Sequence, residues 1–526
     1  MANTSNKGTS TPAKEWKKLS QNEIAILLLF FGVIFGGWFR LSLAARSDFP
    51  VGDGGLFYVM IRTIQENGYR LPEFISYNGL SIPFTYPPLA FYLTGITADV
   101  FGVPLLDIMR WFPAIILVAT LPVVYWLANT LLESSLKAGL ALFIFAMLPR
   151  SITWLIKGGG VTRSLGQLFL ILATISLYSL FKSKERRYLF PSLLFSSLVC
   201  VTHPEAALHT IGFGFLLWLF YGRNKEGMIH AALIVIGTVA LSALWWFPVV
   251  SHHGASPFFL AAQTGFNDVT FFIAPFLFSF SDEPFLPIIT MFAVLGFIAQ
   301  VAKREFLLPA FYVFPFIIEA RNAPNVAVVS TAILAAIALT DVLLPAIARL
   351  AQKFIHTDNL EFLKTGAEKF LFFYFIVSIL IGMHFFTTDL INERLSVEHR
   401  DAFDWIKINI AVENSNFLII TNNPEPLADS VNEWFPVFTG RASLTTIQGY
   451  EWIKDGNFSE RLSSLEALQN CNSISCIETE SQKAVLPFDY VYVTNPESRL
   501  GFELRVDSKY RLIYENKKAL IFEKSK

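Results

Sequence analysis

The chain contains 526 residues, of which 53% are hydrophobic and 16% are charged, and its formal net charge at pH 7 is -1. Because soluble domains carry about 25% charged residues, this composition excludes a fully soluble protein and makes the lipid bilayer the first expected partner. The near-neutral charge gives no indication of nucleic-acid binding, and no nucleic-acid partner is expected.

The amino-terminal half of the chain begins with a polar segment and then becomes strongly apolar. Residues 1–21 contain four lysines, and we expect them to form a cytoplasmic tail. The first hydrophobic span, 22–43, is long and lacks a small-residue cleavage site, so it is expected to remain as a signal anchor. Further spans recur, each near the about 20 residues that a bilayer requires. They lie at 108–131, 136–152, 164–181, 188–203, 206–221, 228–247, 284–301, 305–320, 325–347 and 368–387.

The segment 86–103 is also apolar, but a Pro-Pro pair opens it and an aspartate interrupts it. We therefore predict a helix that lies along the outer interface instead of an additional span. With this assignment, the connections on the cytoplasmic side hold about twice as many Lys and Arg residues as those on the opposite side, as the positive-inside rule requires. The sequence thus predicts a multi-pass protein of the cell membrane with about 11 transmembrane helices, a cytoplasmic amino terminus and an extracytoplasmic carboxyl terminus.

The chain changes character after residue 388, where half of its 42 acidic residues lie. Buried strands are predicted at 416–421 and 489–493, a closing hairpin at 510–514 and 519–523, and helices at 397–409, 426–438 and 458–470. The predicted fold class is therefore a polytopic α-helical membrane domain, 22–387, followed by a soluble extracytoplasmic α/β domain, 388–526. Cys471 and Cys476 can form a disulfide if this domain faces an oxidising compartment.

Candidate chemistry begins just outside the first span, in the first outer loop, 44–107. Asp48 and Asp53 lie there among glycines, directly before an amphipathic helix predicted at 56–67. Carboxylates at the mouth of a membrane helix are costly to place, and glycines let the backbone approach a ligand closely. The alternative is a solvated loop in which the two aspartates serve as helix caps.

A second group consists of basic residues on the predicted outer side, where the positive-inside rule disfavours Lys and Arg. Guanidinium groups bind phosphate oxygens in pairs, so this group suits an anionic lipid headgroup. The members considered for such binding are Arg62, Arg150, Lys157, Arg163 and Arg321. The alternative is that they reach toward lipid phosphates without a catalytic role.

An outer turn contains His203 and Glu205, which can bind a divalent cation or orient a substrate. The alternative for these two is a structural His-Pro corner. Soluble-enzyme motifs do not compete with these groups, because the chain has no Walker-type phosphate loop, no GxSxG elbow and no HExxH motif.

Taken together, these features resemble the GT-C superfamily of integral-membrane glycosyltransferases, in the branch of protein O-mannosyltransferases and lipid A aminoarabinose transferases. The resemblance rests on the acidic motif, the interfacial helix after it, the segment Tyr86-Pro87-Pro88-Leu89 and the outer carboxyl-terminal domain. The tail also resembles bacterial relatives around Glu433-Trp434-Phe435-Pro436 and Gly449-Tyr450-Glu451-Trp452.

The sequence departs from the family pattern in two places. The family motif is often Asp-Glu or Asp-x-Asp, whereas Gly54-Gly55 follows Asp53 here. A second carboxylate that many members place after the third span is replaced by the segment from Gly158 to Arg163. A divalent cation therefore stays an open question at this point.

The resemblance implies transfer of a sugar from a polyprenyl-phosphate donor to an acceptor hydroxyl on the outer face, with inversion. The acceptor is a protein, a lipid or a glycan. Asp53 is the expected general base and Asp48 the second choice, with Tyr86, His203, Glu205 and the five basic residues named above as substrate-binding candidates. Two rival classes stay open, a transporter or flippase of a lipid-linked or anionic substrate and a non-catalytic membrane scaffold.

Overall fold

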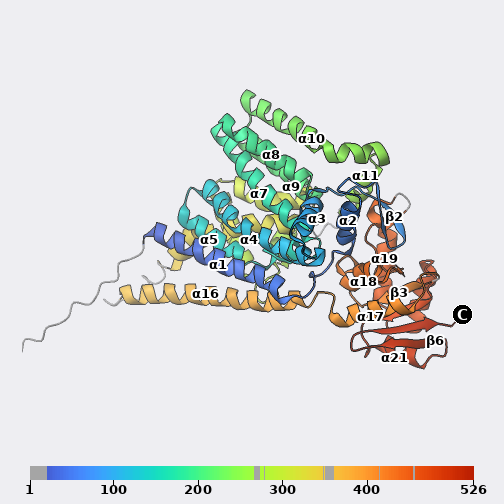
Figure 1. The fold of residues 1–526 in the computed structure, drawn as a ribbon. Coiled ribbons are helices and arrows are strands. Elements are labelled where there is room, and N and C mark those ends of the chain that lie inside the picture. The colour runs from blue at the N-terminus through green and yellow to red at the C-terminus, as the bar shows by residue number, and fades with distance from the viewer. Residues whose placement is uncertain are drawn as a thin grey trace, which may run out of the picture.

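The computed structural model shows a bundle of helices with a smaller mixed domain at one end (Figure 1). The residues that it describes are 20–265, 273–277, 279–347, 349, 360–413, 415–453 and 456–525. The predicted cytoplasmic tail lies, up to residue 19, outside these ranges.

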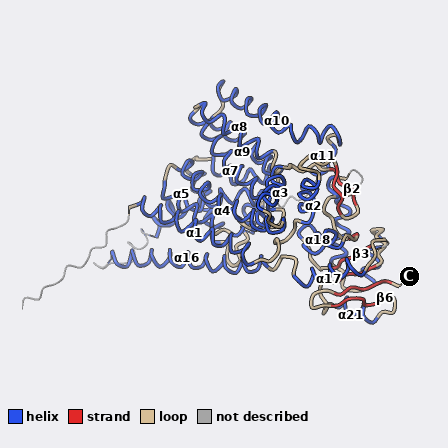
Figure 2. Tube along the Cα trace, in the orientation of Figure 1, coloured by secondary structure: helices blue, strands red, loops and turns tan. Residues whose placement is uncertain are grey.

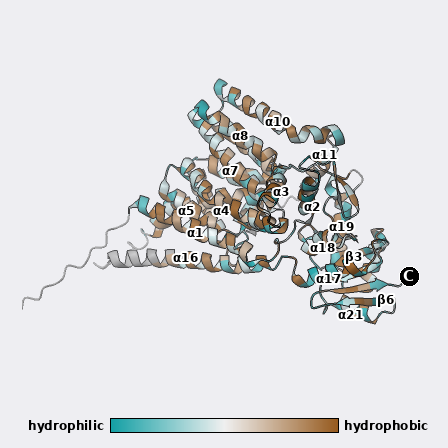
Figure 3. Ribbon diagram, in the orientation of Figure 1, coloured by the Kyte–Doolittle hydropathy of each residue, from teal (hydrophilic) through white to brown (hydrophobic). Residues whose placement is uncertain are grey.

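The bundle is built from helices that overlap every predicted span. They are α1 (Gln21–Arg46), α4 (Leu105–Leu132), α5 (Ser135–Ala146), α7 (Gly160–Ser183), α8 (Leu189–Cys200), α9 (Pro204–Tyr221), α10 (Lys225–His253), α12 (Ile288–Ala302), α13 (Leu307–Ile318), α14 (Ala323–Ile337) and α16 (Leu360–Ile391). In Figure 3, hydrophobic residues are prominent along the bundle helices that it labels, for example α1, α4 and α7. Their shared core contains side chains such as Leu121, Phe145 and Leu334, which are almost completely buried.

Fewer of these helices are long enough to cross a bilayer than the sequence predicts. Among the described residues, five helices are sufficiently long and apolar, and the number becomes six if the bent pair Ser135–Ala146 and Pro149–Ile156 forms one span. The two parts of that pair differ in direction by 84°. The predicted places of the apolar helices are confirmed, whereas the number that crosses the membrane stays a prediction.

A buried arginine fixes the bend at the end of α5. Arg40 of α1 is fully buried, and its guanidinium donates to the carbonyl oxygens of Gly36 and Ala146 and to Ser151 Oγ, at 2.7–3.0 Å. Ala146 is the last residue of α5, so a cation satisfies one carbonyl group at the negative end of that helix. The chain can therefore break there and form a short turn, η1 (Pro149–Ser151), and a short helix, α6 (Thr153–Ile156).

Basic side chains from separate connections meet at one end of the bundle. Lys137 and Lys303 both pair with Asp341, at 2.8 and 3.1 Å. Lys182 pairs with Glu133 in an adjacent connection. All three lysines belong to connections that the positive-inside rule assigns to one face, and the ion pairs place Lys137 and Lys303 together. Which side of the membrane this face meets stays a prediction.

The first outer loop folds at the opposite end, beside the carboxyl-terminal domain (Figure 1). It contains α2 (Gly55–Glu66), the hairpin strands β1 (Phe74–Tyr77) and β2 (Leu80–Pro83), and α3 (Leu89–Phe101). The hairpin turns at Asn78-Gly79, both with positive φ, which is the dipeptide that a two-residue type I′ turn favours. Helix α3 has 13 residues and so a length of about 20 Å, which is too short for a hydrocarbon core of about 30 Å.

The carboxyl-terminal domain carries most of the strands (Figure 2). Its sheet has the order β4-β3-β5-β7-β6, with β4, β3 and β5 parallel and the rest antiparallel. The strands are β3 (Asn416–Ile420), β4 (Ala442–Ser443), β5 (Tyr490–Val493), β6 (Tyr510–Glu515) and β7 (Leu520–Lys524). The helices are α17 (Val397–Asn409), α18 (Ser430–Thr439), α19 (Phe458–Gln469), α20 (Ile474–Lys483) and α21 (Arg499–Val506).

The predicted strands and helices of this domain are confirmed, with three additions and one shift. Helices α20 and α21 and the short strand β4 were not predicted. Helix α18 begins at Ser430 instead of residue 426, because Asp429 accepts the backbone N–H groups of Val431 and Asn432 and so caps the helix there.

One hydrophobic core joins this domain to the first outer loop. It contains Phe49, Ile64 and Ile82 from the loop and Trp434 and Phe435 from α18, all nearly inaccessible to solvent. The predicted boundary at 388 therefore separates the chain in sequence, whereas in space the loop 44–107 and the carboxyl-terminal domain pack as one unit.

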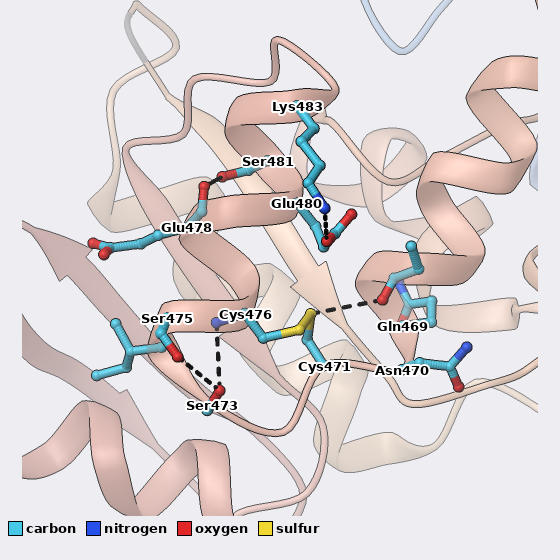
Figure 4. Close-up of a disulfide and its surroundings, with 12 residues drawn as sticks. Gln469, Asn470, Cys471, Ser473, Ser475, Cys476, Glu478, Glu480, Ser481 and Lys483 are labelled. Carbon is cyan, nitrogen blue, oxygen red and sulfur yellow. Dashed lines mark hydrogen bonds and ion pairs between the residues drawn. A yellow bond between two sulfur atoms is a disulfide. The ribbon is translucent and has the colours of Figure 1, made fainter.

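Cys471 and Cys476 form a disulfide between the end of α19 and the first turn of α20 (Figure 4). We expect alkylation of the unfolded, unreduced protein to label Cys200 alone, and alkylation after reduction to label all three cysteines, as counted by mass spectrometry. The Cys200→Ser variant serves as the control, because it should incorporate no label before reduction. Three labels without reduction would contradict the disulfide.

Candidate active site

Asp53 lies where two glycine-containing loops touch. Gly158 donates its backbone N–H to Val51 O at 2.8 Å, and the Gly159 N–H donates to Asp53 Oδ1 at 3.3 Å. A Cβ atom on Gly158 would lie 1.7 Å from the backbone oxygen of Asp53, so only glycine permits this approach. Asp53 is 7% exposed. The loop that carries this carboxylate is thus fixed by the loop that precedes α7.

Arg163, one turn into α7, meets the other oxygen of the same carboxylate. Its Nη2 lies 3.1 Å from Asp53 Oδ2, and its Nη1 donates to Trp154 O at 3.4 Å. Lys157 Nζ lies 4.3 Å from the centre of the Trp154 ring and 2.6 Å from Glu393 Oε2. Each oxygen of Asp53 accepts one hydrogen bond and retains a lone pair for a ligand.

Tyr86 continues the site from the start of the segment that leads into α3. Its hydroxyl lies 3.2 Å from Thr162 Oγ1 and shares a hydrogen bond with it. Its ring contacts the rings of Phe57 and His203, with centroid separations of 5.0 and 6.4 Å. Burial raises the pKa of Tyr86, so its hydroxyl keeps its proton at neutral pH.

His203, Glu205 and Arg321 form the far side of the site. The Ala206 N–H donates to His203 Nδ1 at 3.2 Å, so a neutral imidazole carries its proton on Nε2, which lies 3.7 Å from Glu205 Oε2. Arg321 Nε lies 3.7 Å from Glu205 Oε1, and the Arg321 side chain is 47% exposed. The Arg321 guanidinium is thus loosely paired and accessible.

The carboxyl-terminal domain covers Asp53 with helix α18. Glu433 Oε1 accepts the N–H of Leu56 at 3.0 Å, and Trp434 Nε1 donates to Gly52 O at 3.2 Å. Burial, and then the negative charge of Asp53, raise the pKa of Glu433 to about 8. The segment that contains Glu433 resembles relatives in sequence, but no site residue is predicted in it. No local pattern indicates it, because the contact joins residues almost 380 positions apart.

Three of the predicted site residues form ion pairs with residues other than those described above. Asp48 pairs with Arg394 and Arg400 at the start of the carboxyl-terminal domain. Partial burial opposes ionisation of Asp48, but hydrogen bonds from the two arginines outweigh it and lower its pKa. Arg62 pairs with Glu66 on the exposed face of α2, and Arg150 pairs with Asp282 at 2.9 Å.

The donor set around Asp53 does not fit a divalent cation. Its two oxygens accept from a guanidinium and a backbone N–H, and Arg163 occupies the segment where a second carboxylate was sought. Over the described ranges, no group of three or more His, Cys, Asp or Glu side chains is arranged to hold a metal ion. Among the cationic side chains of this region, that of Arg321 is 47% exposed and accessible to an anionic ligand.

No protein-family model matches the chain, and no curated protein matches it significantly. Several solved structures match the chain. The oligosaccharyltransferase AglB of Archaeoglobus fulgidus aligns with 90% of this chain and 70% of its own, at 15% identity and a TM-score of 0.59. ArnT of Cupriavidus metallidurans, solved with undecaprenyl phosphate, aligns with 94% of this chain and 97% of its own, at 12% identity and a TM-score of 0.52.

The arabinofuranosyltransferase AftD from Mycobacteria aligns with 97% of this chain and 40% of its own, at 13% identity and a TM-score of 0.53. All three are GT-C superfamily glycosyltransferases. The chain has the GT-C fold. The resemblance inferred from sequence is therefore confirmed at the level of fold, and the candidate site involves the first outer loop and the adjoining connections of this bundle. One AglB structure was solved with Zn and sulfate.

Proposed function

We propose that the chain is a membrane glycosyltransferase that moves a sugar from a polyprenyl-phosphate donor to an acceptor hydroxyl, with inversion. The observation that carries this proposal is the buried Asp53 carboxylate, which Arg163 and Gly159 orient. Lys157 packs against the neighbouring Gly52, and Arg321 and His203 lie beside Glu205. A base beside cations suits a reaction that deprotonates a hydroxyl and releases a phosphate. ArnT was solved with undecaprenyl phosphate and AglB with a dolichol-phosphate, which supports this class of donor.

In the proposed reaction, Asp53 accepts the proton of the acceptor hydroxyl as that oxygen bonds to the anomeric carbon of the sugar. The bond between the anomeric carbon and the phosphate oxygen breaks, and polyprenyl phosphate leaves with the electron pair. Arg321, which is accessible, meets the charge of the leaving phosphate, with Lys157 as a second cation once a ligand replaces Glu393. Attack opposite the leaving group inverts the anomeric configuration.

We further propose that the site faces the outside of the cell membrane, with the amino terminus in the cytoplasm. The lysines that meet Asp341 lie at the other end of the bundle, where the positive-inside rule predicts the cytoplasm. The Cys471–Cys476 disulfide belongs to the domain on the side of the site, and disulfides persist in oxidising compartments.

Reconstitution into liposomes tests the function. The full chain is supplied with a panel of polyprenyl-phosphate-linked sugars, and the release of polyprenyl phosphate and the transfer of labelled sugar are measured. A glycosyltransferase cleaves the sugar–phosphate bond. Movement of intact lipid-linked sugar across the bilayer without cleavage would overturn the proposal in favour of a transporter or flippase. The absence of both cleavage and movement would overturn it in favour of a scaffold.

The role of Arg321 has its own test. We expect Arg321→Ala to raise the KM for the lipid-linked donor about tenfold or more, with a smaller change in kcat, because a charge-assisted contact to phosphate is lost. Arg499→Ala is a suitable control, since its side chain is 75% exposed on α21 and pairs with Glu503. An unchanged donor KM in Arg321→Ala would assign the phosphate to other cations.

A further inference from the structure

We propose that Glu433 of the carboxyl-terminal domain is part of the reaction centre, where its carboxylic acid O–H donates a hydrogen bond to an oxygen of the acceptor substrate beside Asp53. This inference rests on the proposed function and adds to it the residue by which the outer domain orients the acceptor. The carboxyl-terminal domain would then take part in the reaction instead of merely covering the bundle.

Contacts on both sides of Glu433 fix it against the loop that carries the base. The Tyr77 hydroxyl donates to the backbone oxygen of Glu433 at 2.6 Å, and the indole of Trp434 bonds to Gly52 O. A Cβ atom on Gly55 would come within 2.5 Å of the Glu433 backbone oxygen, so helix α18 and the start of α2 touch directly. Residues on either side of Asp53 are therefore bonded to residues at and next to Glu433.

The side chain of Glu433 has one satisfied oxygen and one unsatisfied oxygen. It is 3% exposed, and its Oε1 accepts the Leu56 N–H. Its Oε2 is buried and has no hydrogen-bond partner in the part of the chain that the structure describes. A buried polar atom without a partner costs free energy that a ligand can recover. The unpaired oxygen thus indicates where a substrate atom belongs.

The charges around this carboxyl decide whether it donates or accepts. Burial and the negative charge of Asp53 oppose ionisation, whereas Arg163 and the backbone N–H groups of Leu56 and Gly54 favour it. Tyr77, which is also titratable, bonds the backbone oxygen of Glu433 and not its carboxyl. The balance raises the pKa of Glu433 to about 8, which favours the protonated carboxyl at neutral pH. A hydroxyl or ether oxygen of the acceptor can accept a hydrogen bond from the protonated carboxyl. The reacting hydroxyl of the acceptor can at the same time donate a hydrogen bond to Asp53.

The pH dependence of acceptor binding tests the assignment. In wild type, the acceptor KM should rise as the pH passes about 8, because the donor is lost when Glu433 ionises. Glu433→Gln is neutral at every pH and keeps a donor, so it should retain the wild-type KM within a few fold at pH 7 and lose the alkaline rise. Glu433→Ala should raise the acceptor KM roughly ten- to a hundredfold at all pH values and leave the donor KM unchanged.

Asp429→Asn provides the matched control. Asp429 is also buried and caps the same helix, but Thr421, Val431 and Asn432 satisfy its oxygens. This variant should lower the thermal stability and keep the wild-type alkaline rise. The same alkaline rise in Glu433→Gln, or a normal acceptor KM in Glu433→Ala, would overturn the assignment while the proposed function stands.

A second measurement does not depend on sugar transfer. Infrared difference spectra of the full chain between about pH 6 and about pH 9 should show loss of a protonated-carboxyl band in wild type, and Glu433→Gln should lack this band. An identical band change in both proteins would overturn the assignment. If wild type shows the band but cleaves no lipid-linked sugar, then the proposed function fails and the protonated Glu433 stands.

Discussion

Replacing Asp53 with asparagine is expected to lower kcat for sugar transfer by about a thousandfold or more. The substitution keeps the shape of the side chain and removes its basicity, and a positioned general base contributes roughly a hundred- to ten-thousandfold. It also leaves Arg163 without its carboxylate, which costs stability because a partly buried cation loses its partner. Initial rates with saturating donor, together with a thermal unfolding scan, separate the two effects.

Asp48→Asn is the informative comparison for this variant. Asp48 is 45% exposed and pairs with Arg394 and Arg400, so its loss should lower the stability of the domain contact and change kcat much less. If Asp53→Asn retained more than about a tenth of the wild-type rate while Asp48→Asn lost activity, the base would be Asp48 and the role of Asp53 would be structural.

The second large effect is expected for Gly158→Ala. The added methyl group would need to occupy a position 1.7 Å from the Asp53 backbone oxygen and 2.9 Å from the Gly54 Cα, so the two loops must separate. Misplacing a reacting group by about 1 Å costs on the order of a hundredfold in rate. We therefore expect kcat/KM to fall about a hundredfold, with the protein still inserted in the membrane and folded.

The matched control for this variant is Gly37→Ala in α1. Its nearest neighbours would be methyl groups of Val118 at 3.8–3.9 Å, which is ordinary contact, and alanine favours a helix over glycine. This variant should keep wild-type activity and stability. Equal activities of Gly158→Ala and Gly37→Ala would show that the close approach of the two loops does not govern the site.

Hydrophobic length and charge predicted the bundle well, because lipid imposes a pattern that local sequence records. They could not give the number of crossing helices, since several apolar helices have fewer than 18 residues, and α5 bends where Arg40 caps it. Nothing in a window of sequence reports such a cap, because its partners lie more than 100 positions apart.

Which side chains meet around Asp53 was predicted only in part, for a related reason. Position outside the spans was sufficient to select Asp53, Arg163 and Arg321, which lie in connections that the fold brings to the same end. The same criterion selected Arg62 and Arg150, which pair with Glu66 and Asp282 instead. Counting charges on one face does not show which carboxylate pairs with each cation. It also cannot identify a residue such as Glu433, which only the tertiary structure places near Asp53.

The single core shared by the first outer loop and the carboxyl-terminal domain limits how this protein can be divided. A chain cut after Ile391 would lose Arg394 and Arg400 opposite Asp48, Glu393 opposite Lys157 and the indole above Gly52. Such a truncation would yield an incomplete bundle and not a minimal catalyst. Chimeras that exchange the outer domain between GT-C proteins should accordingly transplant residues 44–107 together with it, so that both surfaces of the joint come from one parent.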